Sequence, residues 1–317
     1  MSRILVTPRS LTRMPDPALN ALAQDGHELV FSRAGETPDE AALLALVPGC
    51  IGWLAGVEPV SPRVLQAATG LRAISRNGSG ADNIPLDVAD RLGIRVLRAN
   101  GANARGVAEL AIALALASLR HVPESSAALK AGTWQRRTGL EIEGRTLGLV
   151  GCGAIGRLVA RFALAFDARV RVFDPFPDTS FQPTGDFAWV GFDVLLEKAE
   201  ILSLHCPMPA NGRPLLDAAA LVRLHPACHV INTARAGLVD EAALLAALDR
   251  EQIRVYATDV FAVEPPEPSA LLRHPRVIAT PHIGGLTAES VRRATVTAVE
   301  NLRHALAEPS ASAGTSA

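Results

Sequence analysis

Short runs of Val, Ile and Leu alternate along the chain with longer Ala- and Leu-rich stretches of helical period. Repeated alternation of strand and helix favours parallel sheets covered on both faces, so the predicted fold class is α/β. The predicted strands are Ile4–Thr7, Glu28–Phe31, Ile51–Ala55, Leu71–Ser75, Arg95–Leu97, Thr146–Val150, Val170–Phe173, Ile201–His205, Val230–Thr233, Val255–Asp259 and Val277–Thr280.

The predicted strands are too numerous for one average sheet of about 5–6 strands, and this favours two sheets. The 317 residues also allow about two domains. A break is expected near Leu97–Gly101, and a second series of strands begins at Thr146. Helices are predicted at Ala18–Gln24, Ile155–Phe166, Glu241–Leu248 and Ala288–Leu306, and residues 308–317 are predicted to form a disordered tail.

Composition excludes several classes of protein. The 31 Lys and Arg residues balance 32 Asp and Glu residues, and a net charge of −1 gives no field for steering onto nucleic acid or an anionic membrane. The only lysines, Lys130 and Lys198, do not lie in a GxxxxGK[ST] loop, which excludes a P-loop NTPase. We therefore expect neither nucleic acid nor membrane as a partner.

Cysteine usage and apolar run lengths indicate the compartment. Cys50, Cys152, Cys206 and Cys228 are too scattered for a disulfide framework, and their spacing predicts no metal site. The N-terminus has no apolar run long enough for a signal peptide, and the longest apolar stretch, Leu110–Ala117, is less than half of the ~20 residues that a membrane span needs. The expectation is a soluble, cytoplasmic protein.

The strongest local motif is a glycine-rich turn between a strand and a helix. Gly151, Gly153 and Gly156 form GxGxxG, with Ala154 and Ile155 inside it, directly after the strand Thr146–Val150. These glycines permit a tight turn, close approach of a pyrophosphate and close helix–strand packing, while the helix N-terminus attracts phosphate. Asp174 ends the next strand and can accept hydrogen bonds from ribose hydroxyls, so NAD is favoured over NADP.

A second set of charged and polar residues lies at the ends of three predicted strands. Arg235 follows one predicted strand, Asp259 and Glu264 follow the next, and His282 follows the last. Ligands of open α/β sheets bind outside the carboxyl ends of strands. An Arg can bind a substrate carboxylate, and a His beside a carboxylate can act as a proton donor. After a dinucleotide turn, this set indicates hydride transfer.

At this point the sequence resembles the D-isomer-specific 2-hydroxyacid dehydrogenases, the family that includes phosphoglycerate dehydrogenases and glyoxylate/hydroxypyruvate reductases. The resemblance extends from about Gly56 to Arg303. Besides the motifs above, it rests on the segments Arg76–Ile84, Asn103–Glu109, Gly132–Trp134 and His205–Pro207. The first ~55 residues match only in their alternation of strand and helix.

The resemblance implies a role for each matching residue. Arg235 is expected to bind the substrate carboxylate and carbonyl, His282 to exchange a proton with the carbonyl oxygen, and Glu264 to pair with His282. The backbone N–H groups of the loop Gly78, Ser79 and Gly80 are expected to bind the carboxylate as well. Asp259 and the backbone of Thr233, Ala234 and Arg235 are expected to position the nicotinamide, with Cys206 and Pro207 beside the adenosine.

The family architecture implies two Rossmann-like domains with parallel sheets. An NAD-binding domain, residues 100–283, is expected to be inserted into a flavodoxin-like substrate domain formed by residues 1–99 and 284–307. A homodimer is expected to form through the NAD-binding domain. The substrate is expected to be a small 2-oxo or 2-hydroxy acid.

Two features depart from the family pattern, and a third residue narrows the choice within the family. Ala236 follows the catalytic Arg where the family usually has Gly, and Ala would be strained there if the position needed a positive φ; we expect a tolerated variant. Control by serine feedback is not expected, since the chain shows no C-terminal regulatory domain. Glu264 argues against the related formate dehydrogenases, in which Gln partners the His.

The remaining candidate residues are expected to have structural roles. Cys152 and Cys206 are expected to be structural thiols, His225–His229 a loop and not a metal cluster, and Trp134 a packing anchor near the domain junction. Arg76 leads into the substrate loop, and binding of a second anionic group on the substrate is a hypothesis for it.

The interpretation is an NAD-dependent interconversion of a 2-oxo acid and a D-2-hydroxy acid. Two alternatives stay open: a non-catalytic NAD(H)-sensing protein resembling the corepressors built on this fold, and a phosphite-type dehydrogenase with the same catalytic set. The sequence names neither the substituent on C2 nor the physiological direction.

Overall fold

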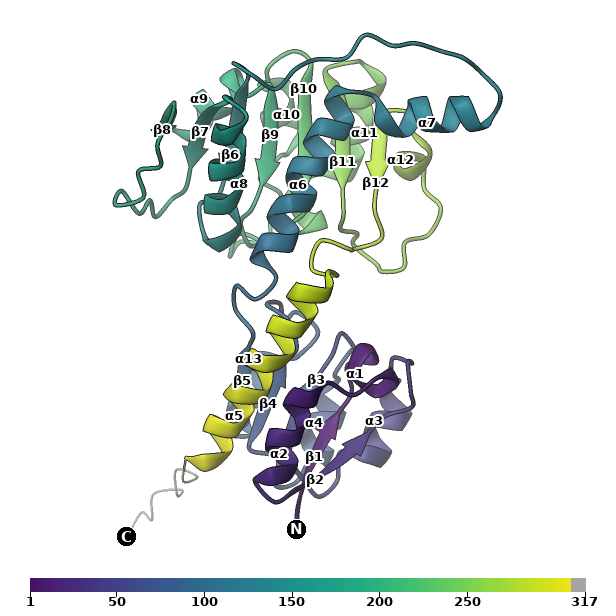
Figure 1. Cartoon of the computed structure of the whole chain (residues 1–317), viewed down its shortest axis with the longest axis vertical. Coiled ribbons are helices and arrows are strands. Elements are labelled where there is room, and N and C mark those ends of the chain that lie inside the picture. The colour runs from purple at the N-terminus through teal and green to yellow at the C-terminus, as the bar shows by residue number, and fades with distance from the viewer. Residues whose placement is uncertain (309–317) are drawn as a thin grey trace. The chain divides into compact units, whose positions relative to one another are not determined.

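Two sheets of parallel strands form the framework of the computed structural model, which describes residues 1–308 (Figure 1). Contacts divide the chain into two units. Unit 1 holds Met1–Asn103 together with the described chain from Ala288 to residue 308, and unit 2 holds Ala104–Thr287. Each crossing between the units lies four residues later than the boundaries expected after residues 99 and 283. The expected tail, beyond residue 308, lies outside the described residues.

Unit 1 contains a five-stranded parallel sheet with the order β2-β1-β3-β4-β5. Its strands are β1 (Ser2–Val6), β2 (His27–Phe31), β3 (Cys50–Ala55), β4 (Ala73–Arg76) and β5 (Arg95–Arg98). Its helices are α1 (Arg9–Arg13), the 3₁₀ helix η1 (Pro17–Leu19), α2 (Asn20–Gln24), α3 (Glu40–Leu46), α4 (Pro62–Ala67), α5 (Leu86–Arg91) and α13 (Ala288–Ala307).

Both faces of this sheet are buried. Successive residues of β1 point to opposite sides, so Leu5 packs with α3, α4 and α5 while Ile4 packs with α1, α2 and α13. Gly52 in β3 makes room for α13, because a Cβ at that position would lie 3.1 Å from the Leu306 side chain. The last helix of the described chain therefore completes the core of the unit that contains the N-terminus.

Unit 2 contains a seven-stranded parallel sheet with the order β12-β11-β10-β9-β6-β7-β8. Its strands are β6 (Thr146–Val150), β7 (Arg169–Phe173), β8 (Phe187–Trp189), β9 (Ile201–Leu204), β10 (Cys228–Asn232), β11 (Ile253–Thr258) and β12 (Val277–Ala279). Its helices are α6 (Ala104–Leu119), α7 (Val122–Lys130), α8 (Ala154–Ala165), α9 (Phe192–Lys198), α10 (Ala218–Val222), the 3₁₀ helix η2 (Ala236–Leu238), α11 (Glu241–Asp249) and α12 (Ala270–Arg273).

The strand order of unit 2 reverses between β6 and β9. The chain runs outward from β6 through β7 to β8 and then returns to β9 on the other side of β6 (Figure 1). Helices α6 and α8 cover one face of the sheet, and α9, α10 and α11 cover the other. Such a reversal leaves a crevice at the carboxyl ends of the two strands, where ligands of doubly wound sheets bind.

Local sequence explains where several helices begin. Asp39, Asp217 and Asp240 each accept a hydrogen bond from a backbone N–H in the first turn of the helix that follows, namely α3, α10 and α11. Ser61 caps α4 in the same way, and Pro62 occupies the first helical position, where no hydrogen-bond donor is needed.

All of the predicted strands are present, with ends that differ by at most two residues, and the predicted α/β class is confirmed. The strand β8 was not predicted. It has only three residues, all partly exposed, and it pairs on one side with β7 at the edge of the sheet. A short edge strand lacks the continuous apolar run that identifies strands buried on both faces.

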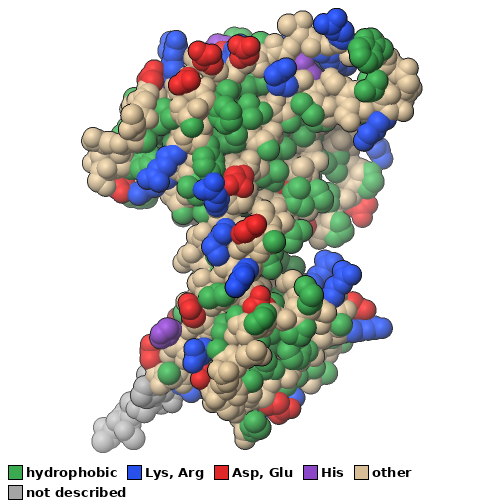
Figure 2. Space-filling model, in the orientation of Figure 1, with side chains coloured by type: hydrophobic (Ala, Val, Ile, Leu, Met, Phe, Trp, Pro, Cys, Tyr) green, Lys and Arg blue, Asp and Glu red, His purple; other side chains and the backbone are tan. Residues whose placement is uncertain are grey.

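Acidic and basic side chains are interspersed over the visible face of both units (Figure 2). In residues 1–308, no single helix is long and apolar enough to cross a membrane. The pair α6 and α7 reaches the required length and composition only together, and the two helices are bent by 64° relative to each other.

Candidate active site

The glycine-rich turn of unit 2 connects β6 to α8. Gly151 has a φ of +96°, and a Cβ there would lie 2.6 Å from the carbonyl oxygen of His205. A Cβ on Gly156 would lie 2.2 Å from the carbonyl oxygen of Gly151, whereas a Cβ on Gly153 would meet open space. The first and third glycines are thus required by the protein's own packing, and the second leaves the backbone accessible to a ligand.

The N-terminus of α8 is open to an anion. The helix begins at Ala154, and Gly153 at the N-cap offers no side chain to bind the backbone N–H groups of the first turn. Unpaired N–H groups and the helix dipole together attract a phosphate. Ala154 and Ile155, predicted to contact the cofactor, lie in this first turn.

Asp174 follows β7 and faces the turn. Its Oδ2 accepts a hydrogen bond from the Cys152 backbone N–H at 2.8 Å, and its Oδ1 accepts one from the Phe176 backbone N–H at 2.9 Å. Each carboxylate oxygen has a second lone pair, so ribose hydroxyls can still be bound. Asp174 therefore holds the glycine-rich turn in addition to the role predicted for it.

The neighbouring strand ends carry polar atoms without protein partners. Within the described chain, Thr233 Oγ1 after β10 and His205 Nδ1 after β9 are buried and make no hydrogen bond. Buried polar groups are normally hydrogen-bonded, so unpaired ones at a crevice fit a polar ligand. Together with the open helix N-terminus, these atoms fit a dinucleotide.

The thiols beside this crevice are uncharged near neutral pH. Burial raises the pKa of both Cys152 and Cys206 to about 11. A thiol that keeps its proton is a poor nucleophile, as expected for structural residues. Within residues 1–308, no group of three or more His, Cys, Asp and Glu side chains is arranged to hold a metal ion.

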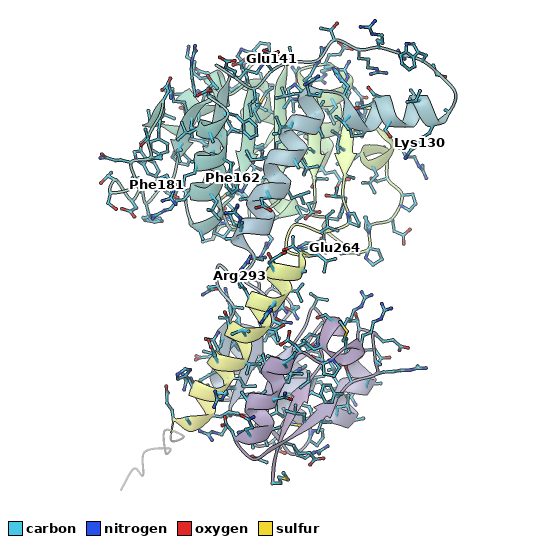
Figure 3. The ribbon with its side chains drawn as sticks, in the orientation of Figure 1. Lys130, Glu141, Phe162, Phe181, Glu264 and Arg293 are labelled. Carbon is cyan, nitrogen blue, oxygen red and sulfur yellow. The ribbon has the colours of Figure 1, made fainter. Side chains whose placement is uncertain are left out.

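The catalytic candidates lie after three neighbouring strands of the same sheet: Arg235 after β10, Glu264 after β11 and His282 after β12. His282 Nδ1 and Glu264 Oε2 are 2.7 Å apart. Glu264 Oε1 accepts a hydrogen bond from the backbone N–H of Phe261 at 3.1 Å. Figure 3 shows Glu264 in the loop between β11 and β12.

The hydrogen bond to Glu264 determines how the imidazole can act. A carboxylate accepts a hydrogen bond from Nδ1–H, so Nε2 is the ring nitrogen left for chemistry. The His282 and Glu264 side chains are 52% and 38% exposed, which leaves the pair accessible to a substrate. Arg235 is half-buried in extended backbone, and its Nη1 donates to the carbonyl of Ala234 at 2.7 Å.

Asp259 is 2% exposed and faces the segment that contains His282. Its Oδ1 accepts hydrogen bonds from Thr280 Oγ1 at 2.6 Å and from the Ile283 N–H at 2.8 Å, and its Oδ2 accepts one from the Gly284 N–H at 2.7 Å. Sequence analysis missed Thr280. Thr280 could have been found from the sequence, because it is a polar residue at the end of a predicted strand, two residues before His282.

Ala236 shows no backbone strain. It begins the 3₁₀ helix η2, and it is absent from the positive-φ residues of the described chain. The expectation that Ala is tolerated at this position agrees with the geometry.

The loop predicted to bind the substrate carboxylate lies in unit 1, after β4. The carbonyl of Gly78 accepts a hydrogen bond from Ala99 N–H at 3.0 Å, and that of Gly80 accepts one from Arg76 Nε at 2.8 Å. Within the described residues, the N–H groups of Gly78, Ser79 and Gly80 have no hydrogen-bond partner. A loop with its carbonyls tied back and its N–H groups free is suited to bind an anion.

Arg76, at the end of β4, is buried beneath this loop and is 7% exposed. Besides Gly80, its guanidinium donates to the backbone carbonyls of Ala55, the last residue of β3, and of Gly56, which follows it. The hypothesis that Arg76 binds a second anionic group stays a prediction, and these hydrogen bonds indicate that it shapes the loop. Trp134, expected to be a packing anchor, is instead 80% exposed.

Comparison with known proteins agrees with this geometry. Residues 112–284 match the family model of the D-isomer specific 2-hydroxyacid dehydrogenase, NAD binding domain. The D-3-phosphoglycerate dehydrogenase of Mycobacterium tuberculosis is 39% identical over 85% of this chain and 52% of its own length. The hydroxypyruvate reductase of Thermotoga maritima is 37% identical over 77% of this chain and 80% of its own length.

A crystal structure of a Thermus thermophilus protein is 35% identical, covers 96% of each chain and superposes with a TM-score of 0.86. The present chain spans about half the length of its mycobacterial relatives.

The fold and the glycine-rich turn define unit 2 as an NAD-binding domain, and NAD is its cofactor. The chain belongs to the D-isomer-specific 2-hydroxyacid dehydrogenase family.

Proposed function

We propose that this protein is an NAD-dependent oxidoreductase that interconverts a small 2-oxo acid and the corresponding D-2-hydroxy acid. The observation that carries the proposal is the 2.7 Å hydrogen bond between His282 and Glu264. This acid–base pair lies at the carboxyl edge of the same sheet that presents the NAD turn. A proton donor at that edge is what reduction of a carbonyl requires besides hydride.

In this proposal each side chain has a distinct task. Arg235 binds the substrate carboxylate through its planar, doubly donating guanidinium and polarises the neighbouring carbonyl. His282 donates a proton from Nε2 to the carbonyl oxygen during reduction and accepts it during oxidation. Glu264 keeps the proton on Nδ1 and stabilises the charged ring. NAD, when bound, supplies the hydride donor or acceptor.

The remaining predicted residues keep their proposed tasks. The free N–H groups of Gly78–Gly80 bind the substrate carboxylate. Asp259 and the Thr233–Arg235 backbone position the nicotinamide, and Cys206 and Pro207 line the adenosine site. Asp174 binds the ribose hydroxyls and repels the 2′-phosphate of NADP.

The deciding experiment is NADH oxidation, followed by absorbance, with a panel of 2-oxo acids and with NADPH in parallel. Turnover of at least one acid, faster with NADH, supports the proposal. Tight NADH binding without turnover of any acid favours the NAD(H)-sensing alternative. Reduction of NAD⁺ with phosphite alone favours the phosphite-type dehydrogenase.

We also propose a homodimer that forms through unit 2, in a cytoplasmic protein. Helix α7 has no buried residue, and the segment after it projects from the unit between Lys130 and Glu141 (Figures 1 and 3). Leu129 and Trp134 in this arm are 58% and 80% exposed. Exposed apolar side chains gathered on one arm are typical of a contact surface.

Light scattering coupled to size exclusion tests the dimer. Wild type is expected at twice the mass of the chain, and the double variant Leu129→Ser/Trp134→Ala at the mass of one chain. Met14→Ser, which removes an apolar side chain that is 78% exposed in unit 1, serves as the control and should stay dimeric. A monomeric wild type would disprove the homodimer.

A further inference from the structure

Three hydrogen bonds from one short turn converge on the buried carboxylate of Asp259. The donors are the Thr280 hydroxyl and the backbone N–H groups of Ile283 and Gly284, all within 2.8 Å. A Cβ on Gly284 would lie 3.0 Å from Asp259 Oδ2, so the carboxylate lies directly against the backbone of the turn. Charge-assisted hydrogen bonds of this length are strong, and this carboxylate has little access to competing water.

The residue enclosed by these contacts is His282. Its φ is +52°, a left-handed conformation that is uncommon for a residue with a Cβ. A strained backbone persists only when its surroundings determine it, and such residues cluster at functional sites. The direction of the Cα–Cβ bond, and hence the position of the imidazole, depends on keeping this conformation.

The ring itself has few other contacts that fix it. Within the described chain its side-chain hydrogen bond is the one to Glu264, and its side chain is 52% exposed. Glu264 can set the rotation of the ring about its own axis, but the backbone of the turn sets where the ring lies. The Thr280 hydroxyl anchors the entrance of that turn, and the N–H groups of Ile283 and Gly284 anchor its exit.

We propose that Thr280 is a positioning residue that acts through Asp259 to hold His282 in its left-handed, reactive position. The inference rests on the proposed function of His282. It also adds a structural task to Asp259, whose predicted partner is the nicotinamide. Thr280 itself does not contact substrate or cofactor in this proposal.

The test compares Thr280→Val with Thr280→Ser. Valine keeps the shape and removes the hydroxyl, while serine keeps the hydroxyl. Thr280→Val is expected to lower kcat by about 10- to 100-fold, because a displacement of about 1 Å can cost 10² in rate. The KM for the 2-oxo acid and the Kd for NADH should change by less than about threefold, a margin well below the tenfold that a lost charge-assisted hydrogen bond can produce.

Two further readouts separate positioning from a general loss of stability. The primary deuterium isotope effect on kcat, measured with NADH deuterated at C4, should rise in Thr280→Val because the hydride-transfer step becomes slower. Thr280→Ser should restore most of the wild-type kcat. Thr258→Val is the matched control: it removes a buried hydroxyl from the end of β11 that bonds to backbone groups of Asn232 and Val260 and to the Tyr256 side chain, but not to Asp259. It should lower Tm without raising the isotope effect.

An unchanged kcat in Thr280→Val, or equal losses in the Val and Ser variants, would overturn the proposal. If wild type itself turns over no 2-oxo acid, the proposed function fails, and crystal structures of the two variants then decide about Thr280. A displaced His282 in the Val variant alone would support the positioning role, and an unmoved turn would contradict it.

Discussion

The Asp174 carboxylate accepts a hydrogen bond from the backbone N–H of Cys152, inside the glycine-rich turn, at 2.8 Å. The residue that is predicted to select NAD thus also supports the turn that binds the pyrophosphate. Replacing it affects two parts of the cofactor site at once.

We expect Asp174→Ala to weaken NADH binding by about 10- to 100-fold, since each tenfold corresponds to about 1.4 kcal/mol and at least two hydrogen bonds are lost. NADPH should not reach the affinity of wild type for NADH, because the turn has lost its support. Fluorescence titration measures both affinities. Asp178→Asn, a change at a half-exposed neighbour that pairs with Arg157, is the control. Unchanged NADH affinity in Asp174→Ala would contradict this account.

His282→Ala should reduce kcat by roughly 10²–10⁴-fold, the usual contribution of a general acid–base group. NADH binding should be retained, because the cofactor turn lies on β6 and α8. Glu264→Gln should give a smaller loss, since an amide oxygen can still accept a hydrogen bond from Nδ1–H but does not stabilise a charged ring. Steady-state kinetics and NADH titration on each variant check this. Near-normal turnover by His282→Ala would refute the assignment of the proton donor.

Arg76→Lys should raise the KM for 2-oxo acids, because one ammonium nitrogen cannot occupy the positions of both Nε, which donates to Gly80, and Nη1, which donates to Gly56. We expect a rise of about tenfold or more, given that each hydrogen bond to a charged group contributes about 1.5–3 kcal/mol. The rise should be similar for acids with and without a phosphate group. NADH affinity should be unchanged.

The control for Arg76 is Arg98→Lys, an exposed position at the end of β5. A loss confined to phosphate-bearing acids would instead support the hypothesis that Arg76 binds a second anionic group of the substrate.

His229 predicts how stability depends on pH. Burial lowers its pKa to about 4 from an ordinary value of 6.5, and the side chain is 2% exposed. Between these two values the unfolded chain binds a proton that the folded chain does not. The free energy of unfolding therefore falls as the pH falls from 6.5 to 4, by about 3 kcal/mol for this group, and the effect is constant below that window.

Urea unfolding at several pH values measures this slope, and His229→Gln should reduce it. His304→Gln, at an exposed position on α13, should leave the slope unchanged. An equal slope in wild type and His229→Gln would show that His229 is not the group responsible.

The central strands of each sheet could be predicted because they are buried on both faces and form continuous apolar runs. The strand ends could be predicted as the location of the chemistry, since Arg235, Glu264 and His282 follow adjacent strands. The three hydrogen bonds from the turn to Asp259 could not be predicted, because two of the three donors are backbone N–H groups. Every residue except proline has such a group, so the sequence does not mark which ones bind Asp259.

The burial of Arg76 could not be predicted from the sequence either. An Arg in a sequence is usually an exposed charge, and its burial here depends on carbonyl groups of loops that follow two different strands. The prediction for Trp134 was wrong in the opposite sense. A large aromatic residue suggests a buried position, but the segment that contains Trp134 extends away from the sheet of unit 2.

The packing of α13 on the first sheet has a consequence for synthesis on the ribosome. Ile4, Leu54, Ala298 and Leu302 belong to one core cluster, although the chain between them includes all of unit 2. Residues 104–287 are contiguous and leave the ribosome before α13 does. Unit 2 can therefore fold while the chain is still growing, whereas unit 1 keeps one apolar face of its sheet uncovered until α13 has been synthesised. We expect the nascent N-terminal segment to depend on chaperones for longer than the segment that follows it.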